Sequence, residues 1–492
     1  MTKKIKDFHS IKFTGKFDRK KFYVTTPIYY PNDIPHVGHA YTTIAADILA
    51  RWHKLKGEDV FFLTGTDENA KKVFLAAQKK GIPIKEFVDK LSGDFKNAWE
   101  KLSIDYSRFI RTTDENHVKE VIKILEKTHK KGDIYKGFYE GYYCIGCEAY
   151  YTEKDLEDGC CPIHKTEAEL MKEESYFFKL SKYQKKLLEH YKKNPNFILP
   201  RKRAKEIINR VKGGLNDLSI SRKDYGWGIK IPFDNTHVVY VWYDALTNYY
   251  TATREKGKEK FWPADLHLVG KDIIWFHAVI WPAMLMSLEI KLPKTVFAHG
   301  WWTFDKEKIS KSRGKIINVD ELISIAGSDS IRYFLFREGN FGEDIDFSKE
   351  KVIERHNNEL ADKLGNLVSR VSALAEKYGI EKAITHAHRA NSQNKLFNKF
   401  KAKEIEKHFD NFEIDKALNL IFEFLHLCNE YVQEKKPWET HDKKVLFELV
   451  DSIRKINPYL GIFMPQTSQK IAKIFKNDKI KKAEILFKKI EK

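Results

Sequence analysis

The sequence predicts an α/β protein with a doubly wound parallel sheet split into two halves, an inserted module, and an all-helical C-terminal part. Three observations support this fold class. Strand-like and helix-like runs alternate over residues 22–129 and again over 226–300. The stretch between these halves instead gathers aromatic residues, glycines and four of the five cysteines. After about residue 350 the strand patterns give way to amphipathic helices.

A chain of 492 residues is too long for one hydrophobic core, so we expect several domains. Changes of pattern divide the chain into six segments. They are a basic N-terminal extension, the first sheet half, the insertion, the second sheet half, a region around a basic loop, and a helical domain. In that order they span residues 1–21, 22–129, 130–225, 226–300, 301–352 and 353–492.

Composition excludes several classes of protein. Hydrophobic residues make up 42% of the chain, yet no run of 18 or more apolar residues could span a membrane. The polar, lysine-rich residues 1–21 lack the apolar centre of a secretory signal. Four cysteines crowd between positions 144 and 161, unlike the disulfide framework of a secreted domain. We therefore expect a cytoplasmic protein that makes no use of a membrane.

The charge balance favours a polyanionic partner. The chain carries 88 Lys and Arg against 69 Asp and Glu, a formal net charge of +19. Such an excess favours polyanions through counterion release, although it does not by itself distinguish nucleic acid binding from solubility. Basic residues concentrate at 201–212 and 470–492. Each cluster is equally consistent with a solvated helix face and with a track for an RNA backbone.

A histidine-rich turn lies in the first strand–helix unit. It follows the strand-like run 22–26 and contains His36, Gly38 and His39; the helical run after it ends at Gly57. The start of a helix directs backbone N–H groups and a positive dipole end at an anion. Two histidines three positions apart share one side of the turn and can donate hydrogen bonds to phosphate oxygens. Gly38, which has no Cβ, would let a flat base lie on the backbone.

The next strand leads to a candidate substrate carboxylate. Residues 60–63 form a continuous apolar run, typical of a strand that is buried on both faces. Asp67 follows shortly after, beyond the carboxyl end of the strand, where ligands of doubly wound sheets bind. We interpret Asp67 as the partner of a substrate ammonium group. A helix N-cap is the alternative interpretation.

The insertion carries a pattern of metal ligands. Cys144 and Cys147 form one pair, Cys161 and His164 form another, and thirteen residues separate the pairs. This spacing closes a tetrahedral site in which thiolates and a neutral imidazole favour zinc. Cys160 could replace Cys161, although the Cys-Pro-x-His turn is the better one. Four protein ligands leave no open coordination position, so we predict one structural Zn²⁺ per chain.

Strand and helix signals return after the insertion and then separate. Strand-like runs occur at residues 238–242, 266–270 and 296–299, with a helical run at 273–286. Apolar stripes with helical spacing follow at residues 360–374 and 417–432, and they predict a C-terminal helical bundle.

A second motif lies about 270 positions after the histidine turn. Lys308 and Lys311 alternate with Ile309, Ser310 and Ser312 on a basic loop. Two lysines and two hydroxyls on one loop suit a mobile element that neutralises the charge building up on a leaving pyrophosphate. A solvated surface turn is the alternative interpretation of this loop taken alone.

The order and spacing of the two motifs resemble the signatures written HIGH and KMSKS in class I aminoacyl-tRNA synthetases. The intervening segments resemble the methionyl-tRNA synthetase family, over nearly the whole chain. The resemblance implies a Rossmann-type catalytic domain and a two-step reaction. The methionine carboxylate attacks the α-phosphate of ATP, which is accompanied by Mg²⁺, to give methionyl-adenylate and pyrophosphate. The methionyl group then passes to the 3′-terminal adenosine of tRNA(Met).

The resemblance also implies roles for individual residues. The triphosphate and its transfer would involve His36, Gly38, His39, Lys308 and Lys311, with Arg222 at the active site. The methionine pocket would be formed by Ile28, Tyr30, Asp67, Trp242, Ala245, Tyr249, Ile273 and His277. An aromatic wall suits the long, unbranched and polarizable thioether of methionine.

The helical domain would read the anticodon. Asn366 and Arg370 stand at positions i and i+4 and therefore share one helix face. Trp438 follows Lys435-Lys436-Pro437 and would stack on an unpaired base, with packing in the core as the alternative. Because the chain ends soon after the predicted bundle, we expect a monomer.

Two departures from the family pattern and three rival functions accompany this interpretation. Asn69 and Ala70 replace the usual histidine and glycine after Asp67-Glu68, and Ile309 replaces the usual methionine of the basic loop. The rivals are another class I aminoacyl-tRNA synthetase, a small-molecule nucleotidyltransferase, and a non-catalytic RNA-binding relative. The small size of the insertion disfavours the synthetases that carry a large editing domain. The C-terminal bundle and the retained motifs disfavour the other two rivals.

Overall fold

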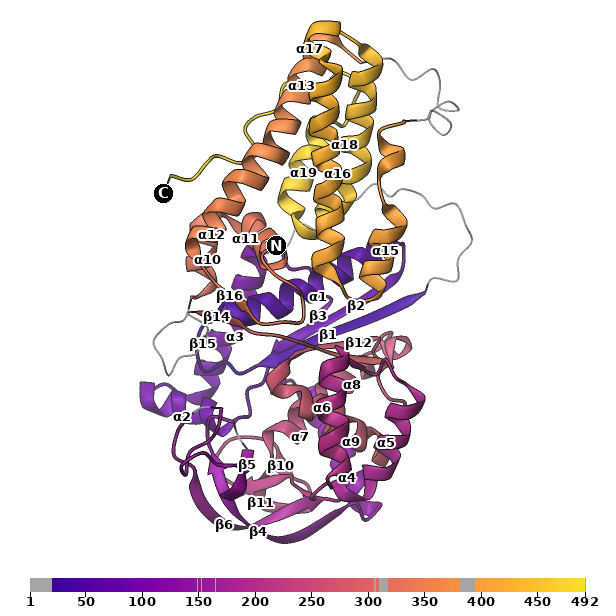
Figure 1. Ribbon diagram of the computed structural model, residues 1–492. Helices are drawn as coiled ribbons and strands as arrows, with labels where there is room; N and C mark the ends of the chain where they lie inside the picture. Colours follow the sequence, from indigo (N-terminus) through magenta and orange to yellow (C-terminus); the bar gives the residue numbers. More distant parts are fainter. Residues whose placement is uncertain are drawn as a thin grey trace.

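The computed structural model describes residues 20–147, 149–151, 153–163, 165–304, 307–308, 317–380 and 394–491. Figure 1 shows the α/β part in the lower half of the view and a bundle of long helices above it. Helix α1 (Val37–Leu55) lies where the two parts meet. Strands β4 (Ile134–Cys144) and β6 (Glu169–Phe178), from the predicted insertion, lie at the end of the molecule far from the bundle.

A six-stranded parallel sheet forms the centre of the α/β part, in the order β3-β2-β1-β12-β13-β7. Its strands are β1 (Lys21–Tyr29), β2 (Asp59–Thr66), β3 (Arg108–Arg111), β7 (Ile198–Leu199), β12 (Leu266–Gly270) and β13 (Thr295–His299). The chain first adds strands on one side of β1 and later on its other side. Ligands of such sheets bind beyond the carboxyl ends of the strands where the order reverses, here between β1 and β12. The predicted parallel α/β fold is confirmed.

Helices cover both faces of this sheet. Besides α1 they are α2 (Lys71–Lys80), α3 (Ile84–Lys101), α4 (Glu115–Lys130), α5 (Gln184–Lys193), α6 (Arg201–Lys212), α7 (Val241–Ala245), α8 (Asn248–Thr251) and α9 (Trp281–Leu288). Successive residues of a strand face opposite sides. Val24 and Phe62 pack into a core that includes α1 and the helical bundle, whereas Tyr23 and Phe61 pack into the core on the other side. The strands are therefore buried on both faces, as their apolar sequences predicted.

The predicted strand at residues 238–242 is wrong in extent and in partner. Strand β11 (Asp234–Val239) ends earlier and pairs antiparallel with β9 (Ser221–Lys223) and β10 (Lys230–Ile231), outside the parallel sheet. Val241 instead begins the short helix α7. Every residue of α7 is buried, so the segment lacks the periodicity that would distinguish a short helix from a strand in the sequence.

The predicted helix at residues 273–286 is divided into three kinds of helix. A 3₁₀ turn, η5 (Lys271–Ile273), is followed by the π-helix η6 (Phe276–Ile280) and then by α9. Wide π turns are rare and occur often at functional sites. This one carries His277, a predicted pocket residue.

The inserted stretch forms its own antiparallel sheet but also contributes to the main one. Strands β5 (Ala149–Tyr151) and β8 (Leu218–Ser219) complete the order β5-β4-β6-β8. Strand β7, from the same stretch, pairs with β13 at the edge of the parallel sheet. A strand of two residues carries no periodic signal, so the sequence did not indicate that part of the insertion joins the parallel sheet. The limits of the domains stay a prediction.

The described chain beyond residue 353 is helical, as predicted, whereas residues 301–352 combine short strands with helices. Strands β14 (Trp302–Phe304), β15 (Glu307–Lys308) and β16 (Ile345–Asp346) form a small sheet. The helices are α10 (Val319–Ala326), α11 (Ser328–Arg337), α12 (Lys349–Arg355), the π-helix η8 (His356–Gly365), α13 (Asn366–Tyr378), α15 (Ala402–Asp410), α16 (Ile414–Lys435), α17 (Pro437–Thr440), α18 (Lys443–Phe463) and α19 (Pro465–Ile474). No helix in the described part of the chain is both long enough and apolar enough to cross a membrane.

A buried ion pair joins the sheet helices to the bundle. The Arg332 guanidinium on α11 contacts Asp47 of α1 with an N–O distance of 2.7 Å, and both side chains are fully buried. The guanidinium also donates to the backbone oxygens of Leu102 after α3 (3.1 Å) and of Phe463 at the end of α18 (2.7 Å). Burial alone would raise the pKa of the Asp47 carboxyl, but Arg51 and Arg332 hold that pKa below its usual value. One side chain thus connects four helices.

We predict that replacing Arg332 by Leu lowers the free energy of unfolding by about 3–5 kcal/mol, because it leaves buried acceptors without their donor. Thermal and urea unfolding measure this loss. Replacing Lys101 by Ala, which breaks the exposed Lys101–Asp320 pair, should cost less than about 1 kcal/mol. Equal losses for the two variants would contradict a central role for Arg332.

Candidate active site

The histidine turn forms the N-terminal cap of α1. The His36 side chain accepts a hydrogen bond from the Gly38 backbone N–H at 3.1 Å, and His39 accepts one from the His36 N–H at 3.3 Å. This is a capping box made by two imidazoles. Their rings stack with centroids 3.8 Å apart. The cap therefore fixes both histidines at the positive end of the helix dipole.

The cap also determines which ring nitrogen carries the proton. Both imidazoles accept through Nδ1, and a neutral imidazole that accepts at Nδ1 bears its proton on Nε2. Each ring can then donate to an anion through Nε2–H. A Cβ at Gly38 would come within 3.1 Å of the His36 ring, so glycine lets that ring fold back over the helix end.

The structure brings the stretch that follows the basic loop to the histidine turn. The Val37 N–H donates to the Ile317 carbonyl at 3.0 Å, and the Val319 N–H donates to the Pro35 carbonyl at 3.3 Å. The stretch that follows the basic loop is thereby hydrogen bonded to the start of α1. On the other flank the Lys308 backbone pairs with Thr303. Lys311 and the rest of the loop, residues 309–316, lie outside the described residues.

Asp67 lies at the carboxyl end of β2 on a rigid loop. Its backbone N–H donates to the Tyr29 carbonyl at 2.8 Å, and its side chain is buried. The neighbouring Glu68 is fully buried, and its carboxylate is held by Arg111 (2.6 and 3.0 Å), Ser92 and Thr113. The sequence did not single out Glu68, although its position in the same acidic pair was a signal. These bonds fix the backbone that carries Asp67.

Aromatic residues form a wall near the reversal point of the sheet. The Trp242 indole of α7 stacks on Phe276 with centroids 3.8 Å apart and an interplanar angle of 7°. Tyr30 lies edge-on to the same indole at 6.5 Å, and the Lys72 ammonium lies 3.3 Å from the Tyr30 ring centre. Sequence reasoning missed Phe276 and Lys72. Such aromatic faces are polarizable and suit a thioether.

His277 and Tyr249 are coupled in the interior of this wall. The His277 Nδ1–H donates to the Ile273 carbonyl at 2.9 Å, so Nε2 accepts the Tyr249 hydroxyl at 2.7 Å. Burial lowers the pKa of His277 to about 4, and the ring is neutral at physiological pH. Ile28 and Ala245 are also buried. Of the predicted pocket residues, Ile28, Trp242, Ala245 and Tyr249 lie in one hydrophobic cluster against which Tyr30 and Ile273 pack. His277 contacts both Trp242 and Tyr249.

Arg222 lies at the boundary between the inserted strands and α7. Its guanidinium carbon is 4.5 Å from the Tyr240 ring centre and 5.3 Å from that of Tyr143. It donates to Ser219 Oγ at 2.9 Å and to the Ser221 carbonyl at 2.7 Å. Because Tyr240 is the N-cap residue of α7, Arg222 supports the segment that bears Trp242.

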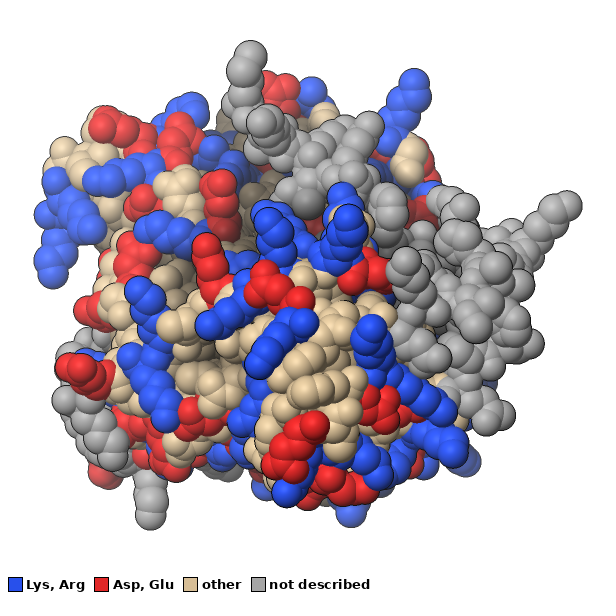
Figure 2. All heavy atoms as spheres, turned by 90° about the horizontal axis from the view of Figure 1, so that it is seen from above, with Lys and Arg blue, Asp and Glu red and all other residues tan. Residues whose placement is uncertain are grey.

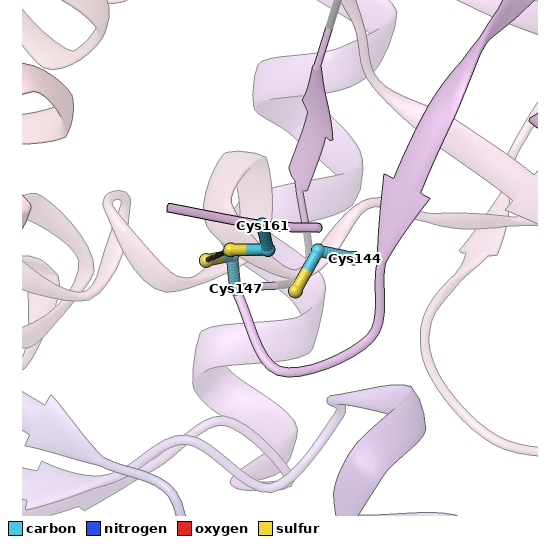
Figure 3. A group of neighbouring side chains, drawn as sticks. All are labelled: Cys144, Cys147 and Cys161. Carbon is cyan, nitrogen blue, oxygen red and sulfur yellow. Dashed lines mark hydrogen bonds between the residues drawn. The ribbon is translucent and has the colours of Figure 1, made fainter. Parts of the chain in front are cut away.

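The inserted module brings three thiols together. The sulfur atoms of Cys144, Cys147 and Cys161 lie within 4.8 Å of one another, and Figure 3 shows them converging from two segments of the chain. Cys147 and Cys161 are 3.4 Å apart at sulfur. Cys160, the alternative ligand, is not part of this cluster; His164 lies outside the described residues. Three convergent thiols are a donor set that fits a metal such as zinc.

The predicted anticodon residues lie on the bundle. Asn366 and Arg370 are exposed on the first turns of α13, and Trp438 is half-buried in α17. The Tyr378 hydroxyl at the end of α13 donates to the Trp438 carbonyl at 3.4 Å. Eight residues of helix, about 12 Å, separate Arg370 from Tyr378. Figure 2 looks onto the molecule from above and shows Lys and Arg spread over this face and interleaved with Asp and Glu.

Comparison with known proteins agrees with this architecture. The family described as "tRNA synthetases class I (M)" matches residues 22–169 and 151–372, and the family "Anticodon-binding domain of tRNA ligase" matches residues 395–490. The methionine–tRNA ligase of Caldanaerobacter subterraneus is 45% identical over 92% of this chain and 73% of its own length. The methionine–tRNA ligase of Rickettsia conorii is also 45% identical, over 92% of both chains.

Solved structures show the same similarity. The Mycobacterium tuberculosis methionyl-tRNA synthetase bound by methionyl-adenylate is 39% identical, with a TM-score of 0.86 over 92% of this chain and 94% of that chain. The apo form of the same enzyme is similar with a TM-score of 0.81 and 34% identity, over 97% of this chain and 100% of its own. The chain belongs to the methionine–tRNA ligases, the methionyl-tRNA synthetase family of class I aminoacyl-tRNA synthetases.

Proposed function

We propose that this chain activates L-methionine with ATP to methionyl-adenylate and pyrophosphate, and transfers the methionyl group to the 3′-terminal adenosine of tRNA(Met). The observation that supports this most directly is the contact of the histidine turn with the stretch that follows the basic loop. The start of α1, with its two capping histidines, is hydrogen bonded to the stretch that follows the basic loop. Tyr29, whose ring contacts His39, accepts a hydrogen bond from the Asp67 N–H and so links the turn to the loop of this buried carboxylate. A buried carboxylate and an aromatic wall together suit an amino acid with an apolar side chain.

Methionine would be held at both of its ends. Asp67 would pair with the substrate ammonium, since it is a buried carboxylate at the carboxyl edge of the sheet. Trp242 and Tyr249, with Tyr30, Ile28, Ala245, Ile273 and the neutral His277, would enclose the thioether. A shorter or branched side chain would leave part of this pocket unfilled, which costs about 1–3 kcal/mol per missing methylene.

ATP would be held by groups that donate to its phosphates. His36 and His39 present Nε2–H at the positive end of α1, and Gly38 keeps the helix start accessible. Lys308 and Lys311 would stabilise the charge that moves onto pyrophosphate as the methionine carboxylate attacks in line. Mg²⁺ bound with ATP would neutralise phosphate charge. The reaction needs positioning and charge stabilisation rather than a protein nucleophile.

Recognition of tRNA would use the bundle. Exposed Asn366 and Arg370 on one helix face can hydrogen bond to base edges, and Trp438 can stack on an unpaired base. We propose that the protein works as a monomer in the cytoplasm, where tRNA is charged. Its five cysteines form no disulfide, which accords with a reducing compartment.

Cys144, Cys147 and Cys161, with His164, would hold one structural Zn²⁺. Cys144 ends strand β4, Cys147 lies in the loop that follows it, and Cys161 lies in the loop between β5 and β6. A metal would tie these loops together and so order the tip of the insertion.

Exchange of pyrophosphate into ATP tests the first step. Among the twenty amino acids, methionine alone should drive exchange. Replacing Lys311 by Ala should reduce the exchange rate about 100-fold or more while leaving methionine binding nearly unchanged, because the lysine acts on charge that develops in the transition state. Exchange that survives this change would contradict the role of the basic loop.

Aminoacylation assays distinguish the role of the helical bundle from that of the activation site. Replacing Trp438 by Ala should leave methionine-dependent exchange unchanged and reduce kcat/KM for tRNA(Met) about 10-fold to 100-fold, the value of one lost base stack. Exchange measured on the same preparation controls for folding. Unchanged charging of tRNA would assign Trp438 to packing alone.

Two neighbouring cysteines test the metal site. Purified protein should contain one zinc per chain by elemental analysis. Replacing Cys161 by Ser should abolish zinc binding, whereas replacing Cys160 by Ser, the matched control, should leave the zinc content unchanged. The opposite result would show that Cys160 is the ligand.

A further inference from the structure

A chain of hydrogen-bonded, buried polar side chains joins two segments that contribute to the proposed methionine pocket. Asn69 Nδ2 lies 2.8 Å from Asp244 Oδ2, and Asp244 Oδ1 lies 2.7 Å from His117 Nε2. His117 Nδ1 lies 2.8 Å from the Thr251 hydroxyl. All four residues are at most 5% exposed. Neither the two signature motifs nor the pocket residues named above include any of them.

The first two residues of this chain, Asn69 and Asp244, belong to different parts of the proposed pocket. Asn69 follows Asp67 by two residues on the loop after β2, where the ammonium of methionine would bind. Asp244 lies in α7 between Trp242 and Ala245, which would contact the thioether. The hydrogen bond from Asn69 to Asp244 therefore joins the segment that binds one end of the substrate to the segment that binds the other.

The orientation of the Asn69 amide is determined by its surroundings. Its Nδ2 faces two groups that can only accept, the Asp244 carboxylate and the Thr112 carbonyl at 3.3 Å. Its backbone is fixed as well, because the Tyr225 hydroxyl donates to the Asn69 carbonyl at 2.8 Å and the Trp227 indole donates to the Glu68 carbonyl at 2.7 Å. The amide is thus held as a donor to Asp244.

Asp244 needs both of its partners. A buried carboxylate is stable only when its oxygens accept hydrogen bonds, and here one oxygen accepts from His117 and the other from Asn69. Losing the amide would leave one oxygen unsatisfied beside the pocket. The segment Trp242–Ala245 could then satisfy it only by shifting, and the shift would move the aromatic wall relative to Asp67.

We propose that Asn69 is a positioning residue for methionine: through Asp244 it sets the separation between the ammonium-binding carboxylate and the thioether-binding wall. The proposal rests on the proposed function, because it takes Asp67, Trp242 and Ala245 as pocket residues. It explains how the chain can use asparagine where the related family has histidine. Either side chain can offer an N–H to Asp244.

The main test replaces Asn69 by Asp, which preserves shape and converts the donor into a second carboxylate. Two carboxylates at hydrogen-bond distance cannot both remain ionised, so the site must bind an extra proton to regain the bond. The groups that face it are Asp67 and Glu68 on the same loop, Glu68 being paired with Arg111, and His117 on α4. We expect the KM for methionine in ATP–pyrophosphate exchange to rise about 10-fold or more at pH 8. It should fall back toward the wild-type value near about pH 6, whereas the wild-type KM should change little over this range.

Two further variants distinguish positioning from general destabilisation. Combining Asn69→Asp with Asp244→Asn restores one donor and one acceptor in reverse order, and should recover most of the methionine KM at pH 8. Asn69→His, the residue of the related family, should keep a KM within about threefold of wild type because it retains an N–H donor. In each case kcat should change less than KM.

A matched control lies in the bundle. Asn394 is also buried and its amide lies 2.8 Å from the carboxylate of Asp451, so Asn394→Asp creates the same clash of charges far along the chain from the pocket. This variant should lower the unfolding temperature without changing the KM for methionine or its pH dependence.

Several results would overturn the proposal. The first is an unchanged methionine KM in Asn69→Asp, and the second is a raised KM in that variant that does not depend on pH. The third is a double variant whose methionine KM is as high as that of the single variant. Should Asn69→Asp fail to fold, Asn69→His and the double variant decide the matter by the same KM measurement. Failure of the wild-type protein to exchange pyrophosphate with methionine would refute the proposed function instead, and the two failures are therefore distinguishable.

Discussion

The ion pair between Asp47 and Arg332 is the contact on which the arrangement of the two halves of the molecule depends. Two fully buried charges are stable only with close geometry and additional hydrogen bonds, and here backbone oxygens of Leu102, Ile462 and Phe463 supply them. These partners belong to helices on both sides of the boundary. The pair thus specifies one packing of α1 against the bundle, since any other packing would leave a buried charge without its partner.

The N-terminus of the same helix, α1, carries the histidines that are proposed to bind phosphate. The N-terminus of α1 is capped by histidines where serine, threonine or aspartate is usual. An imidazole can satisfy the backbone with one nitrogen and still donate with the other, which a carboxylate cap cannot do for an anion. Capping and the proposed phosphate binding therefore use the same residues. This double use accounts for the spacing of the two histidines, which stand three positions apart with a glycine between them.

Much of the fold and part of the site follow from the sequence. Parallel strands buried on both faces leave continuous apolar runs, and the histidine turn, the three clustered cysteines and the helical stripes each carry a local pattern. The two-residue strand β7 and the buried helix α7 carry none, because tertiary contacts decide their conformation. The hydrogen bond of Asn69 and the stacking of Phe276 escaped prediction for a related reason. Their partners, Asp244 and Trp242, are remote in sequence or lie in a segment whose conformation was misjudged.

The core that begins at the sheet continues without interruption through α1 into α16 and α18. A continuously packed interior deforms little, so we expect α1 and the bundle to keep one relative position. The distance from the exposed face of α13 to the histidine cap of α1 is then fixed. An RNA that touches both ends must match that span. We expect such a span to favour RNAs of matching overall shape, independently of which bases the bundle contacts.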